Sequence, residues 1–265
     1  VSPEGQGREF NAENIPYKPV VWLKVAQGGL KEGDFNFIMG YPGSTTRYRS
    51  SNSVKWNLEY TYPFYIKNFS EIISLADELT KNDPAGKLKV ANLIKGLANT
   101  MKNYQGTVDG MKRTHFLQNK LDFEKEYLVW ANSTPERKVK YADLVSKEKA
   151  QYDVIEKTKD RDNVFAILQG LSGTLLNVAS QAYNLRKEME KPLEKRQPGF
   201  TEENLKEFAN GLTYTYNDYF EPVDKALLTR VLKMAAELPV GQRITGLENI
   251  LTGSGKTVDQ WVDEV

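Results

Sequence analysis

The chain has 265 residues, enough for one large core or for one domain with part of another. Its 36 basic and 35 acidic residues leave a net charge of +1, so we expect neither a nucleic-acid partner nor attraction to an acidic membrane surface. Cysteine is absent, which excludes disulfides and thiolate metal sites, and no apolar run of about 20 residues is present that could span a membrane.

The first part of the chain has the pattern of β-structure. After a polar stretch over residues 1–12, the apolar segments Val20–Val25 and Asp34–Met39 predict two strands joined by a glycine-containing turn over residues 26–33. Gly40-Tyr41-Pro42-Gly43 ends the second strand, because proline cannot donate to a sheet ladder and glycine adopts φ values that other residues avoid. Two strands alone are marginal in water, so we expect the rest of their sheet to lie outside this chain.

Beyond about Tyr65 the pattern is helical. One face of a first helix, which ends before Pro84, carries the apolar residues Phe69, Ile72, Ile73, Leu75, Ala76 and Leu79. A second helical pattern runs from Pro84 to about Ala131, and we expect it to kink at its glycines, since glycine costs about 1 kcal/mol in a helix interior. The glycines in question are Gly106 and Gly110.

Helix-start signals divide the rest of the chain. Thr134 followed by Pro135 predicts an N-cap and a first helical turn. A charged helix is expected from Thr134 to Lys159, a more apolar one from Asp162 to Leu193, and another after the cap Thr201. Three further helices are expected from Glu221 to Glu237, from Pro239 to Leu251, and from Val258 to the chain end. The predicted fold class is mainly α: a helical bundle over residues 44–265 with a small β-hairpin over residues 1–43.

No catalytic or metal-binding motif is complete. The single histidine, His115, has basic neighbours and no Gly-x-Ser-x-Gly elbow accompanies it, so we expect no catalytic role for it. Gly253–Thr257 resembles a phosphate-binding loop, but Ile250 stands where that motif requires glycine, so we interpret it as a loop between helices. Asp160 and Asp162, with Asn163, lack the glycine of a calcium loop, and we expect a solvated loop and no metal or cofactor.

An aromatic cluster near the end of the chain has two interpretations. Tyr214, Tyr216, Tyr219 and Phe220 lie at spacings typical of a buried helix face, and we interpret them as core. The alternative is that they line a peptide-binding groove.

Three motifs resemble one family. They are DFNFIMGYPG of residues 34–43 with STTRY of residues 44–48, NIPYKP of residues 14–19, and ANTMKNYQG of residues 98–106. They are similar to the bacterial dipeptidyl aminopeptidases of the dipeptidyl-peptidase 7 and 11 type. The resemblance implies a serine exopeptidase with a trypsin-like double β-barrel and an inserted helical domain. On that basis residues 1–43 are a remnant of the barrel and residues 44–265 a helical cap domain.

The resemblance also implies a role for Asn99. In the family, an asparagine of the helical domain helps to hold the free α-amino group of the substrate. Asn99 is the best match and Asn103 the second, although Thr100-Met101 replaces the aromatic pair of the family. The residues alone favour a different interpretation. Asn99 lies among the apolar residues Leu97, Ala98 and Met101, so its amide is expected to be buried and hydrogen-bonded to a neighbouring helix.

The remaining expectations also follow from the resemblance. The catalytic histidine and aspartate of the family precede this region and the serine follows it, so we expect no catalytic residue and no peptide hydrolysis by this chain alone. The expected partners are a peptide substrate and the catalytic barrel of the same polypeptide, and the full-length enzyme is expected to form a homodimer. The expected location of the protein is the periplasm or outside the cell. Gly40, Pro42 and Gly43 would form a hinge below a helical lid. The alternatives are a stand-alone helical interaction module and a ligand-binding bundle.

Overall fold

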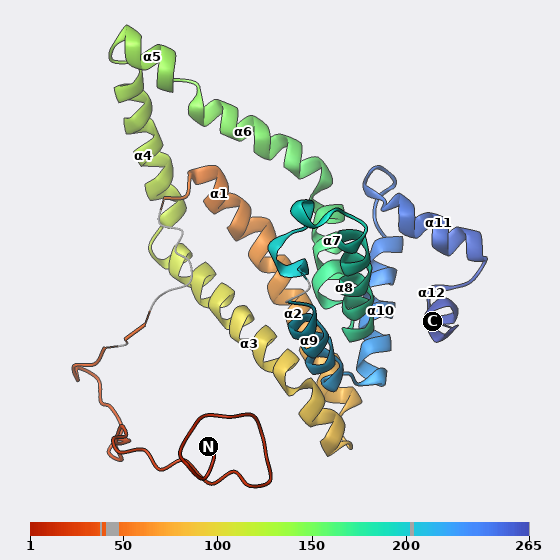
Figure 1. The fold of residues 1–265 in the computed structure, drawn as a ribbon. Helices are drawn as coiled ribbons and strands as arrows, with labels where there is room; N and C mark the ends of the chain where they lie inside the picture. Colours follow the sequence, from red (N-terminus) through yellow and green to blue (C-terminus); the bar gives the residue numbers. More distant parts are fainter. Residues whose placement is uncertain (38, 41–47, 202–203, 265) are drawn as a thin grey trace. The chain divides into compact units, whose positions relative to one another are not determined.

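A computed structural model describes residues 1–37, 39–40, 48–201 and 204–264, and these residues form helices and turns but no strand (Figure 1). The chain divides into two units, Val1–Arg47 and Tyr48–Val265. The predicted mainly helical fold class is therefore confirmed. Every helix in the described residues is too short or too polar to cross a bilayer.

The described residues of Val1–Arg47 do not form the expected hairpin. Gly29 and Gly33 make the predicted turns with positive φ, and Lys31 N–H donates to Asp34 Oδ2 at 2.8 Å. The described residues of the flanking segments, 20–25, 34–37 and 39, do not pair, and their apolar side chains, such as Leu23 at 93% and Phe35 at 88% exposure, face solvent. The expected hairpin is therefore not shown, because the described residues of this unit supply neither further strands nor a packed layer to cover an apolar face.

Tyr48–Val265 is built of helices. The first, α1 (Ser51–Trp56), continues through a π-helical turn (Asn57–Thr61) into α2 (Tyr62–Leu79), and α3 (Pro84–Arg113) returns beside α2 (Figure 1). The others are α4 (Phe116–Ala131), α5 (Pro135–Tyr141), α6 (Leu144–Ile155), α7 (Lys159–Leu171), α8 (Thr174–Met189), α9 (Leu205–Asn217), α10 (Glu221–Ala236), α11 (Thr245–Ser254) and α12 (Val258–Glu264).

Two hydrophobic clusters hold these helices together, and α10 contributes to both. The first joins α2, α3 and α10 through Phe69, Ile72, Ala76, Val90, Leu97, Val223 and Leu227. The second joins α7 to α10 and the turn after it through Val164, Ile167, Val231, Ala235 and Leu238. The predicted apolar face of α2 is therefore confirmed for Phe69, Ile72 and Ala76, which are buried, whereas Leu79 at the end of the helix is exposed.

The expected long helix from Pro84 to Ala131 breaks at a place that the sequence did not indicate. Gly106 and Gly110 continue α3, and the chain turns at His115, which has a left-handed φ of 50°. Thr114 closes α3 by donating its N–H to the Gly110 carbonyl at 3.0 Å. Histidine is among the side chains that tolerate this conformation better than most, so a break without glycine or proline was missed.

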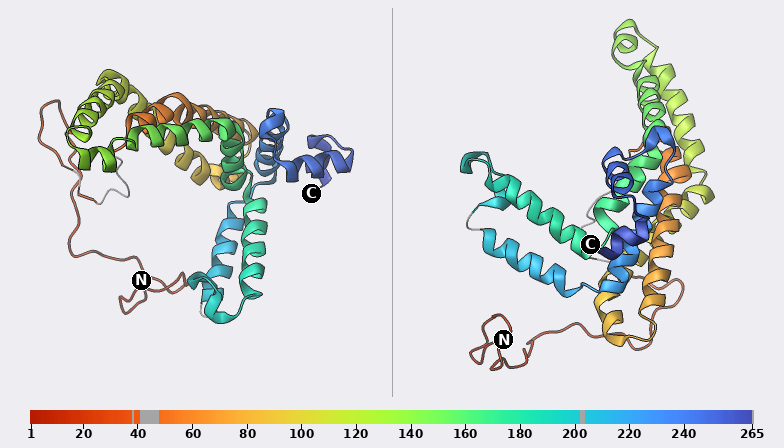
Figure 2. Two further views of the ribbon diagram at one scale, coloured as in Figure 1. Left: turned by 90° about the horizontal axis from the view of Figure 1, so that it is seen from above. Right: turned by 90° about the vertical axis from the view of Figure 1, so that its right-hand side faces the viewer.

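Two helices project from the layer formed by α2, α3 and α10. Figure 2 shows α8 and α9 side by side, leading away from that layer and back to the start of α10. The start of α8 is fixed by Asp224 of α10, which accepts hydrogen bonds from the N–H groups of Thr174 and Leu175. A carboxylate at this position accepts hydrogen bonds from N–H groups that have no partner within the helix, and its negative charge interacts favourably with the positive end of the helix dipole.

Candidate functional site

The candidate site lies on one side of α3. Asp83 caps this helix by accepting the Gly86 N–H at 2.9 Å, with Pro84 in its first turn. Val90, Leu97 and Val108 are buried. At about 100° per residue, these three lie about 160–180° around the helix from Asn99, so the core fixes Asn99 on the outward side.

Asn99 and Asn103 are both exposed, and neither side chain has a hydrogen-bond partner among the residues that the structure describes. The interpretation of Asn99 as a buried amide bonded to a neighbouring helix was therefore wrong. Met101, which packs against the first hydrophobic cluster, lies about 160° around the helix from Asn99, so an apolar neighbour in the sequence does not bury the Asn99 amide. The two free amides lie one turn apart and present acceptor oxygens and N–H donors to solvent.

Glycine accompanies these asparagines. Gly96 and Gly106, like Asn92 and Asn103, lie within about 60° of Asn99 around the helix. We call this set, Asn92, Gly96, Asn99, Asn103 and Gly106, the asparagine face. A Cβ added at Gly96 or Gly106 would meet nothing within 4 Å, so packing within the described chain does not explain either glycine. A helix interior with unpacked glycines suits the close approach of another polypeptide.

The N-terminal end of the asparagine face meets the C-terminal end of α9. Asn92 Nδ2 donates to Asp218 Oδ2 at 3.3 Å, and Lys89 Nζ donates to the Tyr219 carbonyl at 2.9 Å. Asn99 lies seven residues, or about 10 Å, further along the same side of α3. Neither Asn92 nor Asp218 was predicted from the sequence. The position of Asn92, two helical turns before Asn99, indicates that the two asparagines share one side of the helix and could have identified Asn92.

A pocket of about 290 Å³ lies beside this contact, between α3, the end of α7, α8, α9 and α10. Apolar side chains that include Val90, Leu93 and Phe220 form part of its wall, and Lys89, Asp218 and Asp224 are its charged lining residues. Gly173, which also lines it, has φ +119° and stands where a Cβ would lie 2.9 Å from the Asp224 carboxyl. Glycine is therefore required there by backbone conformation and by space.

The aromatic cluster does not form a core as interpreted from the sequence. Tyr214 and Tyr216 are 73% and 54% exposed, whereas Phe220 packs against the first hydrophobic cluster. Tyr216 and Tyr219 stack with their ring centroids 5.4 Å apart. The correction arises because α9 packs mainly on α8, and that contact leaves the side chains of Tyr214 and Tyr216 exposed to solvent.

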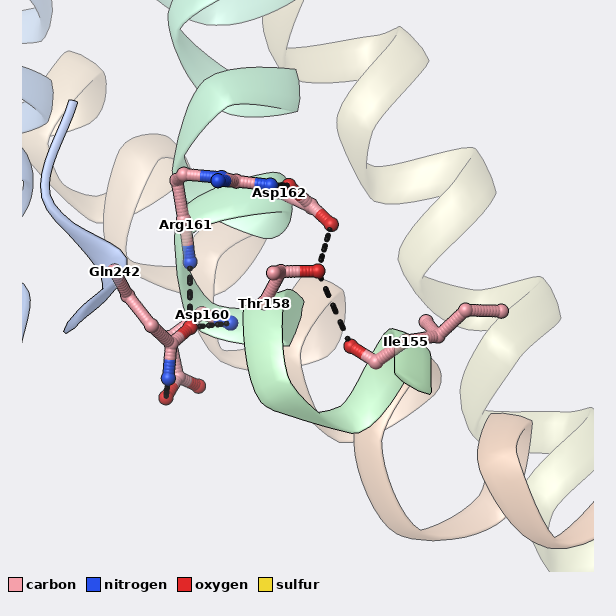
Figure 3. A network of polar contacts seen from close by, with 6 residues as sticks. All are labelled: Ile155, Thr158, Asp160, Arg161, Asp162 and Gln242. Carbon is pink, nitrogen blue, oxygen red and sulfur yellow. Dashed lines mark hydrogen bonds and ion pairs between the residues drawn. The ribbon is translucent and has the colours of Figure 1, made fainter. Parts of the chain in front are cut away.

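The acidic residues near the start of α7 have a structural role. They belong to its first turn, which makes the expected loop wrong: Thr158 Oγ1 donates to Asp162 Oδ2 at 2.6 Å, and Gln242 Oε1 accepts the Asp160 N–H at 2.9 Å (Figure 3). The Thr158 hydrogen bond, assisted by Arg161, holds the pKa of Asp162 below its ordinary value. Within the described ranges, no three acidic or histidine side chains gather as a metal site.

The other sequence candidates are also placed. His115 is an exposed residue at the α3–α4 junction. Gly253 and Ser254 are the last residues of α11, and the loop interpreted over Gly253–Thr257 is limited to residues 255–257, with Gly255 in the left-handed conformation. A helix precedes it instead of the strand of a phosphate loop. Gly40 of the proposed hinge is exposed, whereas Pro42 and Gly43 lie outside the described residues.

Comparison with known proteins identifies the family. The whole chain, residues 1–265, matches the family described as Peptidase S46. The chain belongs to the peptidase S46 family. Its S46 relatives include an Asp/Glu-specific dipeptidyl-peptidase of Shewanella putrefaciens, 30% identical over 97% of this chain and 34% of the relative. A dipeptidyl-peptidase 7 of Capnocytophaga gingivalis is 27% identical over 88% of this chain and 32% of the relative.

A solved S46 structure has the same fold. It is the crystal structure of Porphyromonas endodontalis DPP11 in complex with the dipeptide Arg-Glu, with a TM-score of 0.62 and 22% identity. The match covers 100% of this chain and 37% of that chain. The expected resemblance to the dipeptidyl-peptidase family is therefore confirmed, and the chain spans about a third of the length of the relatives it matches.

Proposed function

We propose that this chain is the helical lid, with an adjoining barrel segment, of a serine-type dipeptidyl aminopeptidase that removes dipeptides from the N-terminus of peptides. The observation that carries the proposal is the asparagine face: two exposed amides, Asn99 and Asn103, without partners in the described chain and flanked by unpacked glycines. The names of the S46 relatives support dipeptide release as the reaction.

The proposed role of Asn99 is to recognise the substrate's free α-amino group. The Asn99 amide oxygen accepts a hydrogen bond from the substrate ammonium, and Asn103, one turn away, lies within reach of the same end of the peptide. Binding energy gained at the amino terminus then positions the second peptide bond at the nucleophile. We place the serine, histidine and aspartate in other parts of the polypeptide.

Residues 1–43 have a different proposed role. Their exposed apolar segments Val20–Val25 and Asp34–Met39 pair with strands of the catalytic barrel of the same polypeptide, which covers the side chains that solvent now contacts. The Gly40, Pro42 and Gly43 segment then acts as the hinge on which the lid closes over bound peptide. We propose a periplasmic or secreted location and a possible homodimer on the family resemblance alone.

The test is made in the complete polypeptide. Asn99→Ala lowers kcat/KM for dipeptide release by about 10- to 100-fold, the effect of one lost charge-assisted hydrogen bond. The matched control is Asn249→Ala, which removes an exposed helical asparagine on α11 and leaves kcat/KM at the wild-type value. An Asn99→Ala enzyme with wild-type kcat/KM would refute the assignment.

A further inference from the structure

One acidic side chain beside the asparagine face has no described ionic partner. Asp218 is exposed at the C-terminal end of α9, and its carboxylate accepts a hydrogen bond from Asn92 Nδ2 at 3.3 Å. No lysine or arginine of the described ranges forms an ion pair with it. Lys89, the cation that lines the same pocket, has its ammonium on the Tyr219 carbonyl.

The distance from this carboxylate to the proposed ammonium site suits a long basic side chain. Asn92, which holds Asp218, precedes Asn99 by seven residues on the same side of α3, or about 10 Å. With bonds near 1.5 Å, the α-nitrogen and the terminal nitrogen of an extended lysine are about 7 Å apart. A hydrogen bond of about 2.9 Å at each end allows one residue to span the two positions.

The surroundings of Asp218 also suit that side chain. Asp218 lines the pocket of about 290 Å³ together with Phe220, the second residue after it, whose ring gives an aliphatic stem an apolar surface. The charged lining consists of one cation, Lys89, and two carboxylates, Asp218 and Asp224, so the pocket favours a positive group. Asp224 already accepts hydrogen bonds from the N–H groups at the start of α8, so Asp218 is the carboxylate available to a positive group in the pocket.

We infer that Asp218 is a specificity-determining residue that selects peptides whose first residue is lysine or arginine. The inference rests on the proposed function, because it takes the α-amino group to be held at Asn99. The carboxylate receives the side-chain ammonium or guanidinium while Asn92 keeps it oriented. Peptides with an uncharged first residue bind the same site without this contact.

The experiment measures a selectivity ratio in the complete polypeptide. Peptides that begin with lysine are compared with peptides that begin with norleucine, which lacks the ammonium, each with glutamate or leucine as second residue. Wild type is expected to have the higher kcat/KM on lysine, and Asp218→Asn is expected to reduce the lysine-to-norleucine ratio about five- to tenfold. Asp218→Lys is expected to invert the preference in favour of a first-residue glutamate, which a purely structural role of Asp218 would not produce.

Asp109→Asn is the matched control, since it removes the same charge from an exposed position on α3 outside the asparagine face. A ratio unchanged by Asp218→Asn, or lowered equally by Asp109→Asn, overturns the inference. If either result is obtained but Asn99→Ala still lowers kcat/KM on both substrates, the inference about Asp218 is rejected and the proposed function is retained. No dipeptide release by wild type from any of these peptides overturns both.

Discussion

The two units of this chain differ in what their apolar side chains contact. In Tyr48–Val265, Ile72 and Val231 are each 1% exposed inside helical clusters, whereas in Val1–Arg47 Leu23 is 93% and Phe35 88% exposed. Hydrogen bonds in the first unit include short-range ones, such as the Lys31 N–H on Asp34 Oδ2 at 2.8 Å. A segment rich in β-branched and aromatic residues thus remains unpaired where the described residues offer no sheet, while amphipathic helices find their partners within the same unit.

The largest expected effect separates the two units by mutation. Ile72→Ala should lower the free energy of unfolding of this chain by about 2–5 kcal/mol, because it leaves a cavity in the first hydrophobic cluster. Leu23→Ala should change it by less than about 0.5 kcal/mol, as for other exposed positions. Urea denaturation followed by circular dichroism measures both, and equal losses for the two variants would contradict the comparison.

Two glycines sharpen the comparison within the helical unit. Gly173→Ala should lower the free energy of unfolding by about 1–3 kcal/mol, since φ is +119° there and Asp224 fills the space of a Cβ. Gly96→Ala should raise it by about 0.5–1 kcal/mol, because alanine is the better helix former in open space. Thermal unfolding reports both signs. In the complete polypeptide, Gly96→Ala should lower kcat/KM despite the added stability, which a glycine without functional contacts would not do.

The smallest expected effect is a pH dependence that resides in the helical unit. The Thr158 hydrogen bond lowers the pKa of Asp162 on folding. The ionised Asp162 therefore adds its full contribution to the free energy of unfolding above the ordinary aspartate pKa near 3.9, and this contribution is lost as pH falls through the lower folded-state pKa. The melting temperature of wild type should therefore approach that of Asp162→Asn as the pH is lowered through that interval. A constant difference between the two curves would exclude this origin.

Local signals in the sequence predicted local structure. Thr134 caps α5 as expected, accepting the Arg137 N–H at 3.3 Å, because the cap and its partner are three residues apart. The cap that Gln242 provides for α7 joins residues 82 positions apart, and no local pattern encodes it. The hairpin is not shown in the described residues for a related reason: alternation predicts a strand, but pairing depends on other strands.

The candidate site was predicted in part. Asn99 and Asn103 were singled out by their motif, yet the phase of α3 that turns them outward emerges only once Val90, Leu97 and Val108 are seen in the core. Asp218 could not be found from sequence, because its relation to Asn92 depends on how α9 returns toward α3. The exposure of Tyr214 likewise depends on which helix α9 packs against.

The most direct test of the account is whether Asn99 binds the substrate's free amino group. In the complete polypeptide, calorimetry would compare the Kd of a dipeptide product with that of its N-acetylated form, for wild type and Asn99→Ala. We predict that acetylation weakens binding to wild type at least about tenfold and that this ratio falls close to one in Asn99→Ala. An Asn99→Ala enzyme that discriminates against the acetylated dipeptide as strongly as wild type would contradict the account.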